Sequence, residues 1–291
     1  MGGEFPVALR IMSTLILGAH GQLGSELQRL LPTATGLSRA QLDFTHPQAF
    51  ESLLEPYQPH VLINCAAYTH VDRAETERDL AFQLNAEAPA ALARYCRNTG
   101  CRLIHVSTDF VFGGELLPDR PRRETDPAIP LSVYGASKLS GEQRILEILP
   151  EALILRTCGL YGHGGTGNFV RTMLRLARSG QPLRVVNDQT CAPTATTDFA
   201  QALIGLMNRN TGGLFHVVNR GAITWHDFAR RIFELSGVSA DLRPITSAEY
   251  AAPAPRPRYS VLDIGQYERL TGETLPEIEA ALSRFLASPS A

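Results

Sequence analysis

The chain has 291 residues, with 27 basic and 29 acidic side chains and a hydrophobic content of 44%. This composition is typical of a globular α/β protein, and the net charge of −2 excludes a strongly basic nucleic-acid or membrane-surface binder. The five cysteines form no CxxC pair, which favours a reducing, cytoplasmic setting. No apolar run is long enough to predict a membrane span, and we expect residues 1–12 to be an N-terminal extension.

Short apolar runs alternate with amphipathic stretches through the first half of the chain. The run at 61–66 is typical of a strand buried on both faces of a sheet. Strands separated by helices form βαβ units, so we predict an α/β fold with a Rossmann-type doubly wound parallel sheet. The strands are expected over residues 14–18, 61–66, 103–107 and 153–156, and the helices over 22–31 and 80–98.

The second half of the chain breaks this rhythm and predicts a smaller C-terminal substrate-binding domain. Helices are expected over 168–179 and 198–208 and from Thr224, where Asp227 closes a start that resembles a capping box. The proline-rich stretch 251–260 predicts a loop. We expect a dinucleotide-binding domain over 13–156, with a return of the chain at about 183–220, and a substrate-binding domain over 157–182 and 221–291.

A glycine-rich turn follows the first predicted strand. Gly18, Gly21 and Gly24 form a GxxGxxG pattern that leads directly into an amphipathic helix. Glycines let the backbone approach a pyrophosphate closely, and the N-terminus of the helix offers free N–H groups and a positive dipole end. The turn therefore predicts a dinucleotide site, although a tight loop without a ligand would use the same residues.

The end of the second predicted strand should contact the adenosine ribose of the cofactor. Ser38 and Arg39 lie there, and no acidic residue follows before Asp43. An acidic residue at this point favours NAD, whereas an arginine favours the 2′-phosphate of NADP. We therefore predict NADPH, with NADH as the alternative if Arg39 is a solvated surface residue.

Tyr134 and Lys138 are the most informative pair in the chain. Residues four apart share one face of a helix, so the phenol and the ammonium can point into one pocket. A nearby ammonium lowers the pKa of a phenol, which could then protonate the oxygen of a ketone as hydride reaches the carbon. Lys138 is also the single lysine in a chain with 26 arginines. The alternative is a surface lysine beside a structural tyrosine.

Thr108 completes the predicted catalytic group. It follows a predicted strand at its carboxyl end, which is where open α/β sheets bind ligands. Its hydroxyl could hydrogen-bond the substrate oxygen. A helix cap or a turn is the alternative role, because Ser, Thr and Asp are common in both.

These motifs resemble the extended short-chain dehydrogenase/reductases and, within them, the dTDP-4-dehydrorhamnose reductase family. The similar segments run in the order of the family across about residues 14–265, and they are GAHGQLGSELQ, LINCAAYTHVDRAE, LNAEAP, IHVSTDFVF, ETDPAIPLSVYGASKLSGE, ILRTCGLYG, VVNDQTCAPT and TWHDFA. The resemblance implies NADPH-dependent reduction of the 4-keto group of a nucleotide-linked 6-deoxysugar, specifically dTDP-4-dehydro-L-rhamnose to dTDP-L-rhamnose, by a monomer or homodimer.

The resemblance also implies roles for single residues. Thr108, Tyr134 and Lys138 would be catalytic. The sugar nucleotide would contact Thr108 and, further, Thr69, Val71, Asn168, Gln189 and Arg256. Together with the turn and the second strand, the predicted cofactor site comprises Gly18, His20, Gly21, Gln22, Leu23, Ser38, Arg39, Asp43, Phe44, Ala66, Ala67, Tyr68, Tyr134 and Lys138.

The chain departs from the family pattern at three places. The family has a tryptophan in its RTSW segment, where this chain has Gly159, so we expect a reshaped sugar pocket with Tyr161 as the nearest side chain to fill it. Phe110 replaces the more usual tyrosine of STDY. Some members bind magnesium through glutamates; Glu26 matches one of these, but Thr197 replaces a second, so we predict no metal site.

Three other functions remain open at this point. A 4,6-dehydratase would need a second carboxylate after Thr108, where this chain has only Asp109 before Phe110. An epimerase would retain its cofactor through a cycle, which an NADP-selective Arg39 argues against. A non-catalytic binding protein of the same fold, similar to the regulatory subunit of methionine adenosyltransferase, is the remaining alternative.

Overall fold

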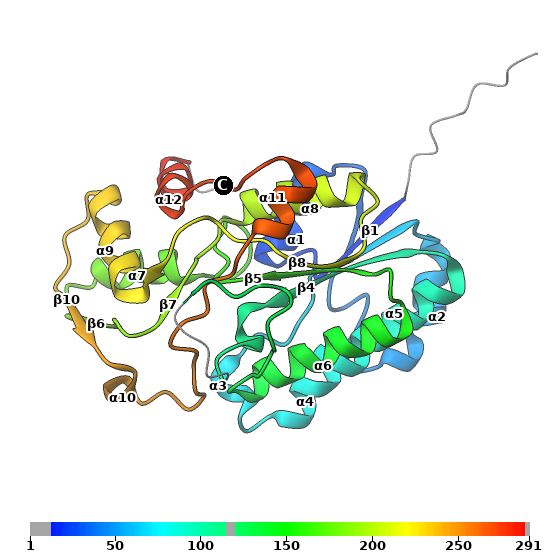
Figure 1. The fold of residues 1–291 in the computed structure, drawn as a ribbon, viewed down its shortest axis with the longest axis horizontal. Coiled ribbons are helices and arrows are strands. Elements are labelled where there is room, and N and C mark those ends of the chain that lie inside the picture. Colours follow the sequence, from blue (N-terminus) through cyan, green and yellow to red (C-terminus); the bar gives the residue numbers. More distant parts are fainter. Residues whose placement is uncertain (1–12, 115–119, 289–291) are drawn as a thin grey trace, which may run out of the picture.

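The computed structural model describes residues 13–114 and 120–288, so the expected extension over 1–12 lies outside the described residues. A six-stranded parallel sheet forms the centre of the molecule, in the order β2-β1-β3-β4-β5-β8 (Figure 1). This order confirms the predicted Rossmann-type doubly wound fold. Its strands are β1 (Thr14–Leu17), β2 (Thr35–Leu37), β3 (Val61–Asn64), β4 (Arg102–Thr108), β5 (Leu153–Thr157) and β8 (Gly213–His216).

Helices cover both faces of this sheet (Figure 1). Successive side chains of a strand point to opposite faces, so Leu15 and Leu17 of β1 join one core cluster and Ile16 joins the other. One face carries α1 (Gln22–Leu30) and α8 (Thr196–Asn208). The opposite face carries α2 (Phe50–Leu54), α4 (Arg78–Phe82), α5 (Ala88–Thr99) and α6 (Val133–Ile148).

The predicted helix over 80–98 is interrupted by a π-helical turn at Gln83–Glu87, between α4 and α5. Pro89 has no N–H and therefore cannot donate to the carbonyl of Asn85, which weakens regular helical pairing there. A Cβ added at Gly141 would lie 2.0 Å from that carbonyl oxygen, so α6 packs closely against the turn. The side-chain amide of Asn85 accepts a hydrogen bond of 2.8 Å from the backbone N–H of Tyr68 and donates one of 3.1 Å to the backbone carbonyl of Tyr68.

A smaller lobe lies at one end of the sheet, at the left of Figure 1. As predicted, Thr224 caps α9 by accepting a hydrogen bond of 3.0 Å from the backbone N–H of Asp227, and residues 251–260 contain no helix after the turn at Ala251. The lobe contains α7 (Phe169–Ala177), α9 (Trp225–Ser236), α10 (Ser247–Tyr250), and two small sheets that pair β6 (Leu183–Val186) with β10 (Leu242–Ile245) and β7 (Thr190–Cys191) with β9 (Ile223–Thr224).

The return of the chain to the main sheet differs from the expectation in one respect. Helix α8 and strand β8 do return, within the expected range of about 183–220. Strand β6, at the start of that range, pairs instead with β10 in the smaller lobe. The helices α11 (Gly265–Thr271) and α12 (Ile278–Ala287) follow, and α12 contacts α9.

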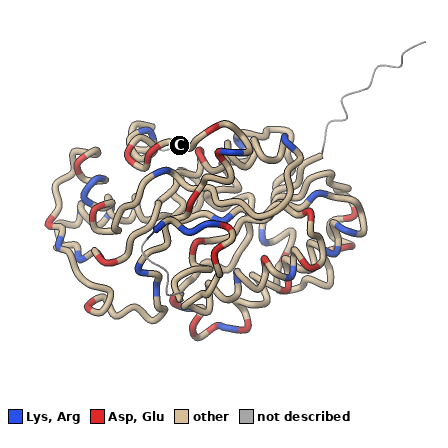
Figure 2. Tube along the Cα trace, in the orientation of Figure 1, with Lys and Arg blue, Asp and Glu red and all other residues tan. Residues whose placement is uncertain are grey.

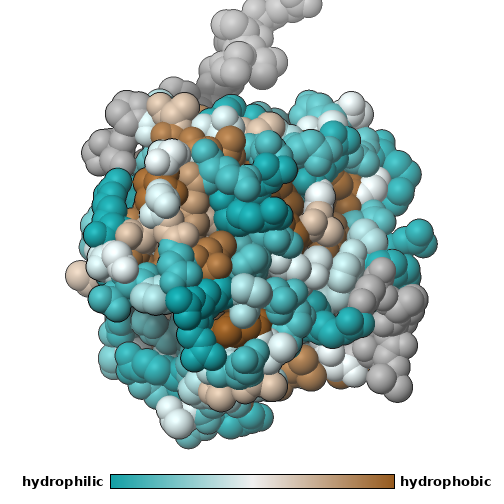
Figure 3. Space-filling model, turned by 90° about the vertical axis from the view of Figure 1, so that its left-hand side faces the viewer, coloured by the Kyte–Doolittle hydropathy of each residue, from teal (hydrophilic) through white to brown (hydrophobic). Residues whose placement is uncertain are grey.

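The surface agrees with the near-neutral composition. Basic and acidic residues are both scattered over the two lobes (Figure 2). The end of the molecule formed by the smaller lobe is mostly hydrophilic, with small hydrophobic patches between the hydrophilic residues (Figure 3). Within the described ranges, no helix has the length and apolar character needed to cross a membrane.

Candidate active site

A cavity of about 650 Å³ lies at the carboxyl ends of β1 to β5, where an open α/β sheet binds its ligands. This volume falls in the range of small-molecule sites. The predicted residues that line it are Gly18, His20, Gly21, Gln22, Leu23, Ser38, Arg39, Phe44, Ala66, Ala67, Thr69, Thr108, Tyr134 and Lys138. Residues from five separate predicted segments therefore meet in one place.

The glycine turn forms the floor of one end of the cavity. Gly18 has a φ of +73°, and an added Cβ would lie 2.9 Å from the backbone nitrogen of Ala66. At Gly24, an added Cβ would lie 2.2 Å from the carbonyl oxygen of Gly18, so any larger residue would separate β1 from α1. Gly21 caps α1 without a side chain, which leaves the first N–H groups of the helix open toward the cavity.

The end of β2 brings Ser38 and Arg39 to the rim of the cavity. Both the backbone N–H and the hydroxyl of Ser38 donate to the side-chain oxygen of Gln41, at 2.9 and 2.8 Å, which fixes this turn. Arg39 is exposed and lines the cavity. The carboxylate of Asp43 accepts from the backbone of Thr45 at 2.9 Å and is not among the lining residues.

Tyr68 lies beside the cavity rather than in its wall. Its phenol is buried and donates to a carboxylate oxygen of Glu77 at 2.6 Å, although its neighbours Ala66 and Ala67 do line the cavity. Tyr68 is therefore not among the lining residues, and its cofactor contact stays a prediction.

Tyr134 and Lys138 both line the cavity from the first two turns of α6, as their spacing predicts. Ser132 caps this helix by accepting a hydrogen bond of 3.1 Å from the backbone N–H of Gly135. The ammonium of Lys138 donates to the backbone oxygen of Val106 at 2.7 Å and lies 3.3 Å from Nε2 of His105. These contacts with β4 fix the position of the lysine.

The charge states of this pair differ from the sequence expectation in one respect. We expected Lys138 to lower the pKa of Tyr134, but burial raises the pKa of that phenol to about 12. Burial lowers the pKa of Lys138 to about 8, against the opposing effect of Glu142. The reason is that desolvation disfavours each charged form more strongly than the neighbouring groups favour it. Tyr134 is therefore a protonated phenol at neutral pH.

Thr108 performs the cap role that the sequence left open as an alternative, and it also lines the cavity. Its hydroxyl accepts from the backbone N–H of Phe110 and donates to Asp109, both at 3.2 Å. The Thr108 side chain lowers the pKa of the Tyr134 phenol, but this effect is smaller than the rise caused by burial. Asp109 is 2% exposed and accepts from Ser260 at 2.6 Å, so the 251–260 loop supports the Thr108 hydroxyl through a carboxylate.

The remaining predicted substrate residues lie away from the cavity wall. The side-chain amide of Asn168 donates to Gln22 at 2.9 Å, and that of Gln189 donates to Ser247 at 2.8 Å. Arg256 forms a two-pronged ion pair with Asp72, at 3.0 and 2.9 Å. Val71 is the first residue of the short helix α3 (Val71–Ala74). The substrate roles of these four residues stay predictions.

Tyr161 does not fill the space beside Gly159, and that expectation is wrong. Its ring is 1% exposed and packs against Phe228 and Phe285, with ring centroids 5.7 and 5.3 Å away. The chain turns at Gly159, which has a φ of +50°. Because of this turn, positions 159 and 161 do not face the same side, as they would in a continued strand.

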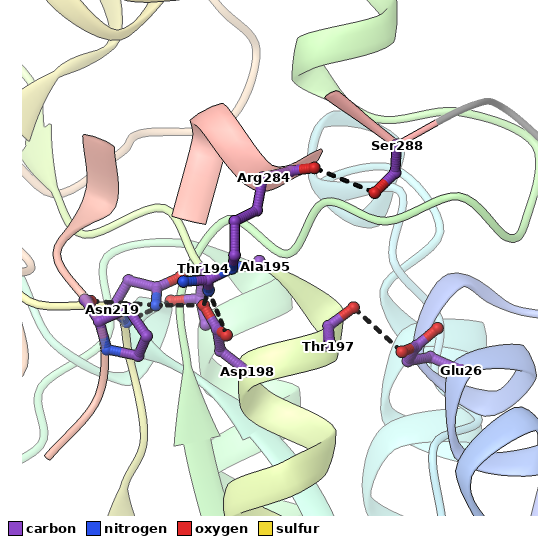
Figure 4. Close-up of polar contacts among 9 residues, drawn as sticks. Glu26, Thr194, Ala195, Thr197, Asp198, Asn219, Arg284 and Ser288 are labelled. Atoms are coloured by element: carbon purple, nitrogen blue, oxygen red, sulfur yellow. Dashed lines mark hydrogen bonds and ion pairs between the residues drawn. The ribbon is translucent and has the colours of Figure 1, made fainter. Parts of the chain in front are cut away.

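Glu26, the one residue that matches the magnesium pattern of some relatives, contacts other side chains of this chain. Its carboxylate accepts from Arg29 at 2.8 Å. It also accepts from the hydroxyl of Thr197 at 3.0 Å, as Figure 4 shows. Across residues 13–114 and 120–288, no three His, Cys, Asp or Glu side chains gather as a metal site would require.

The sequence reasoning missed a glycine-rich segment that covers the turn after β1. Gly162 donates its backbone N–H to the side-chain oxygen of Gln22 at 3.0 Å, and the segment ends at Asn168, which contacts the same oxygen. Its closely spaced glycines in front of a predicted helix were a usable signal. Gly24, of the predicted turn, and Gly159, of the predicted sugar pocket, also line the cavity. The other lining residues that the sequence did not predict are Leu17, Leu37, Leu42, Cys65, Leu84, Val106, Ser107, Thr157, Leu160, Gly165, Thr166 and Gly167.

A doubly wound sheet with a dinucleotide turn, and Thr108, Tyr134 and Lys138 in one cavity, define an NAD(P)H-dependent oxidoreductase of the short-chain dehydrogenase/reductase class. The model of the family described as "RmlD substrate binding domain" matches residues 12–290. The chain belongs to this family, which is that of the dTDP-4-dehydrorhamnose reductases.

Individual relatives agree with this assignment. A dTDP-4-dehydrorhamnose reductase from Streptomyces griseus is 42% identical over 92% of this chain and 91% of its own length. A probable dTDP-4,6-dihydroxy-2-methyloxan-3-one 4-ketoreductase from Streptomyces antibioticus is 44% identical over 86% of each chain. The crystal structure of a Bacillus anthracis dTDP-4-dehydrorhamnose reductase in complex with NADP, at 36% identity, superimposes with a TM-score of 0.90 over 94% of this chain and 98% of its own.

Proposed function

We propose that this chain reduces the 4-keto group of dTDP-4-dehydro-L-rhamnose with NADPH, giving dTDP-L-rhamnose and NADP⁺. The observation that carries the proposal is the meeting of the glycine turn, Thr108, Tyr134 and Lys138 in one cavity. The function of the S. griseus relative supports the substrate, and the NADP complex of the B. anthracis enzyme supports the cofactor.

The residues around the glycine turn fit a dinucleotide. Gly18 and Gly24 let β1, α1 and the backbone of Ala66 pack closely around this turn, and the N-terminus of α1, which has no side-chain cap, supplies N–H donors for a pyrophosphate. Arg39 would hold the 2′-phosphate by charge-assisted hydrogen bonds. Lys138 would hold the ribose next to the nicotinamide. Bound NADPH supplies the hydride that reduces the carbonyl carbon.

Tyr134 would donate the proton that the carbonyl oxygen needs as that carbon is reduced. Its raised pKa, about 12, keeps the phenol protonated at neutral pH, and solvent then restores the proton. Thr108, whose hydroxyl donates to Asp109, would position the substrate oxygen beside the phenol. The ketone, NADPH and one proton are thus converted to the alcohol and NADP⁺.

The sugar nucleotide would lie between the main sheet and the smaller lobe. Thr69 already lines the cavity. Arg256 would exchange its ion pair with Asp72 for the diphosphate, because a guanidinium binds phosphate oxygens in the same two-pronged way. The other proposed contacts are Val71, Asn168 and Gln189. In this proposal residues 157–182 and 221–291 form the substrate-binding domain.

The direct test is oxidation of NADPH by the purified protein with dTDP-4-dehydro-L-rhamnose. We expect turnover that requires the sugar nucleotide, and a Tyr134→Phe variant whose kcat falls by about 10²–10⁴-fold because the proton donor is lost. That variant should still bind NADPH, as measured by the change in cofactor fluorescence.

Other outcomes would point to the other functions. No turnover, with intact NADPH binding, would support a non-catalytic binding protein. Turnover of the sugar without net consumption of NADPH would support an epimerase or a dehydratase. Unchanged kcat in Tyr134→Phe would contradict the role of the phenol while leaving the reduction itself established.

A further inference from the structure

Gly159 exposes its backbone to the cavity, just beyond the carboxyl end of β5. Its φ of +50° is in the left-handed region, and an ideal Cβ built there would lie 2.9 Å from Cη2 of Trp225 and 3.4 Å from Cα of Pro193. A side chain leaving position 159 would therefore enter space that the indole of Trp225 already occupies.

Trp225 reaches this point from a different element. It is the first residue of α9, and the cap formed by Thr224 fixes the start of that helix. The indole packs against Phe169 with a centroid distance of 4.6 Å and against Phe228 at 6.3 Å. It is only half-buried, so these rings support one part of it while another part stays accessible.

The residues around Trp225 lie close to the cavity. Phe169 directly follows Asn168, where the glycine-rich segment that lines the cavity ends. Gly159, whose added Cβ would meet the indole, and Leu160 line the cavity, whereas Trp225 itself lies next to these residues and is not among those that line it. Tyr161, the other aromatic residue near this turn, is buried in the core and offers no surface.

We propose that Trp225 forms the aromatic wall against the 6-deoxysugar and that its indole selects the sugar. The inference rests on the proposed function, because it names the residue that recognises the sugar in that reaction. A 6-deoxyhexose presents a methyl group and C–H faces, and burial of such apolar surface against an aromatic ring is favourable. Gly159 leaves room for the indole, so the residue that contacts the sugar comes from α9 and not from the strand.

The chain offers a direct spectroscopic test, because Trp225 is its one tryptophan. Its intrinsic fluorescence is recorded while the wild-type protein, saturated with NADP⁺, is titrated with dTDP-L-rhamnose or with dTDP alone. We expect dTDP-L-rhamnose to shift or quench the emission and dTDP to leave it nearly unchanged. Equal responses to the two ligands, or no response to saturating dTDP-L-rhamnose, would overturn the proposal.

Variants supply the second readout. We expect Trp225→Ala to lower kcat/KM for the sugar nucleotide by about 10-fold or more, with the KM for NADPH unchanged, as is usual for a lost apolar pocket contact. Trp225→Phe keeps an aromatic wall and should restore most of the activity. If Trp225→Ala is poorly folded, as its melting temperature would show, Trp225→Leu replaces it.

The outcomes separate this inference from the proposed function. A Trp225→Ala or Trp225→Leu variant with wild-type kcat/KM for the sugar nucleotide would overturn the role of the indole, although wild-type turnover would uphold the reductase. An equal rise in KM for NADPH and for the sugar would also contradict it, because it would show a general distortion. Lack of turnover in the wild type would instead refute the reductase, and the fluorescence titration would still test whether Trp225 contacts the sugar.

Discussion

At the scale of single residues, burial sets the charge of the groups that would perform the reaction. Desolvation favours the neutral form of each group, so it raises the pKa of Tyr134 to about 12 and lowers the pKa of Lys138 to about 8. The neutral phenol suits a proton donor. Lys138, in contrast, loses its charge as the pH rises through about 8, just above physiological pH. In this structure its ammonium contacts the backbone oxygen of Val106 and the ring of His105.

The pKa of Lys138 predicts how NADPH binding depends on pH. The ammonium is charged below about pH 8 and loses its proton as the pH rises through that value. We expect the Kd for NADPH to be nearly constant near neutral pH and to rise about 10-fold above pH 8, the cost of one charge-assisted hydrogen bond. Isothermal titration calorimetry across this range measures the effect.

Lys138→Arg is the matched control, because arginine keeps its charge throughout this pH range. Its Kd for NADPH should be higher at neutral pH but should not rise at pH 8. The neighbouring groups do not titrate there: burial raises the pKa of Cys65 to about 12 and holds that of His105 well below its ordinary value. The same rise in the arginine variant would mean that another group causes it.

Arg39 should determine the preference for NADPH. We expect Arg39→Ala to raise the KM for NADPH by about 10–100-fold, because charge-assisted hydrogen bonds to a phosphate are the strong kind, and to leave the KM for NADH nearly unchanged. Steady-state kinetics with both cofactors measure this. Arg97→Ala, which removes an exposed arginine of α5, should change neither KM. Equal effects of Arg39→Ala on both cofactors would show that it does not contact the 2′-phosphate.

At the scale of elements, the residues of the cavity lie on the turns that follow the strands and on the start of α6. Particular residues fix the conformation of each of these segments. The glycine turn after β1 is held by the approach of Gly18 to Ala66, and the cap of α6 is held by Ser132. The turn after β5 is made by Gly159 at a positive φ, which directs the chain away and admits Trp225. Each turn therefore requires its own residue type.

Gly159→Ala should measure the contact between this turn and Trp225. A positive φ alone costs about 1–2 kcal/mol for alanine, and displacing the indole should add about 1–3 kcal/mol to the loss of unfolding free energy. Gly100→Ala is the matched control, because Gly100 has a φ of +72° with no atom within 4 Å of its added Cβ. Urea denaturation measures both variants. Equal losses would mean that Trp225 moves aside without cost.

At the scale of the whole molecule, polar contacts join the C-terminal helix to the sheet domain. Asp198 of α8 has a side chain only 4% exposed and accepts from Arg284 of α12 at 2.6 and 2.8 Å. It also accepts from the amide of Asn219 at 2.7 Å (Figure 4). Because Asp198 and Arg284 lie on separate helices, this carboxylate couples the folding of the two parts of the chain.

Asp198→Ala should therefore destabilise the protein as a unit. We expect it to lower the free energy of unfolding by about 1–3 kcal/mol, because the buried amide of Asn219 loses a partner. The melting temperature, measured by circular dichroism, should fall accordingly. Asp241→Ala is the control, since Asp241 pairs with Arg243 on an exposed surface and should leave the melting temperature unchanged. A wild-type melting temperature for Asp198→Ala would contradict the coupling.

The sequence by itself determined the features that depend on local spacing. The alternation of strands and helices predicted the parallel sheet, and the glycine pattern and the four-residue spacing of Tyr134 and Lys138 predicted two parts of the site. These predictions were possible because backbone periodicity and helix geometry are properties of neighbouring residues. The residue assignments of the site stay predictions until ligands are tested.

Only the tertiary structure decided the features that join distant segments. It placed Trp225 against Gly159, Asp72 against Arg256 and Ser260 against Asp109, and it assigned β6 to the smaller lobe. It also reversed the expected direction of the pKa shift of Tyr134. The physical reason is the same in each case: burial and side-chain contact depend on residues that are far apart in the chain. A local sequence pattern does not show which of these residues approach one another.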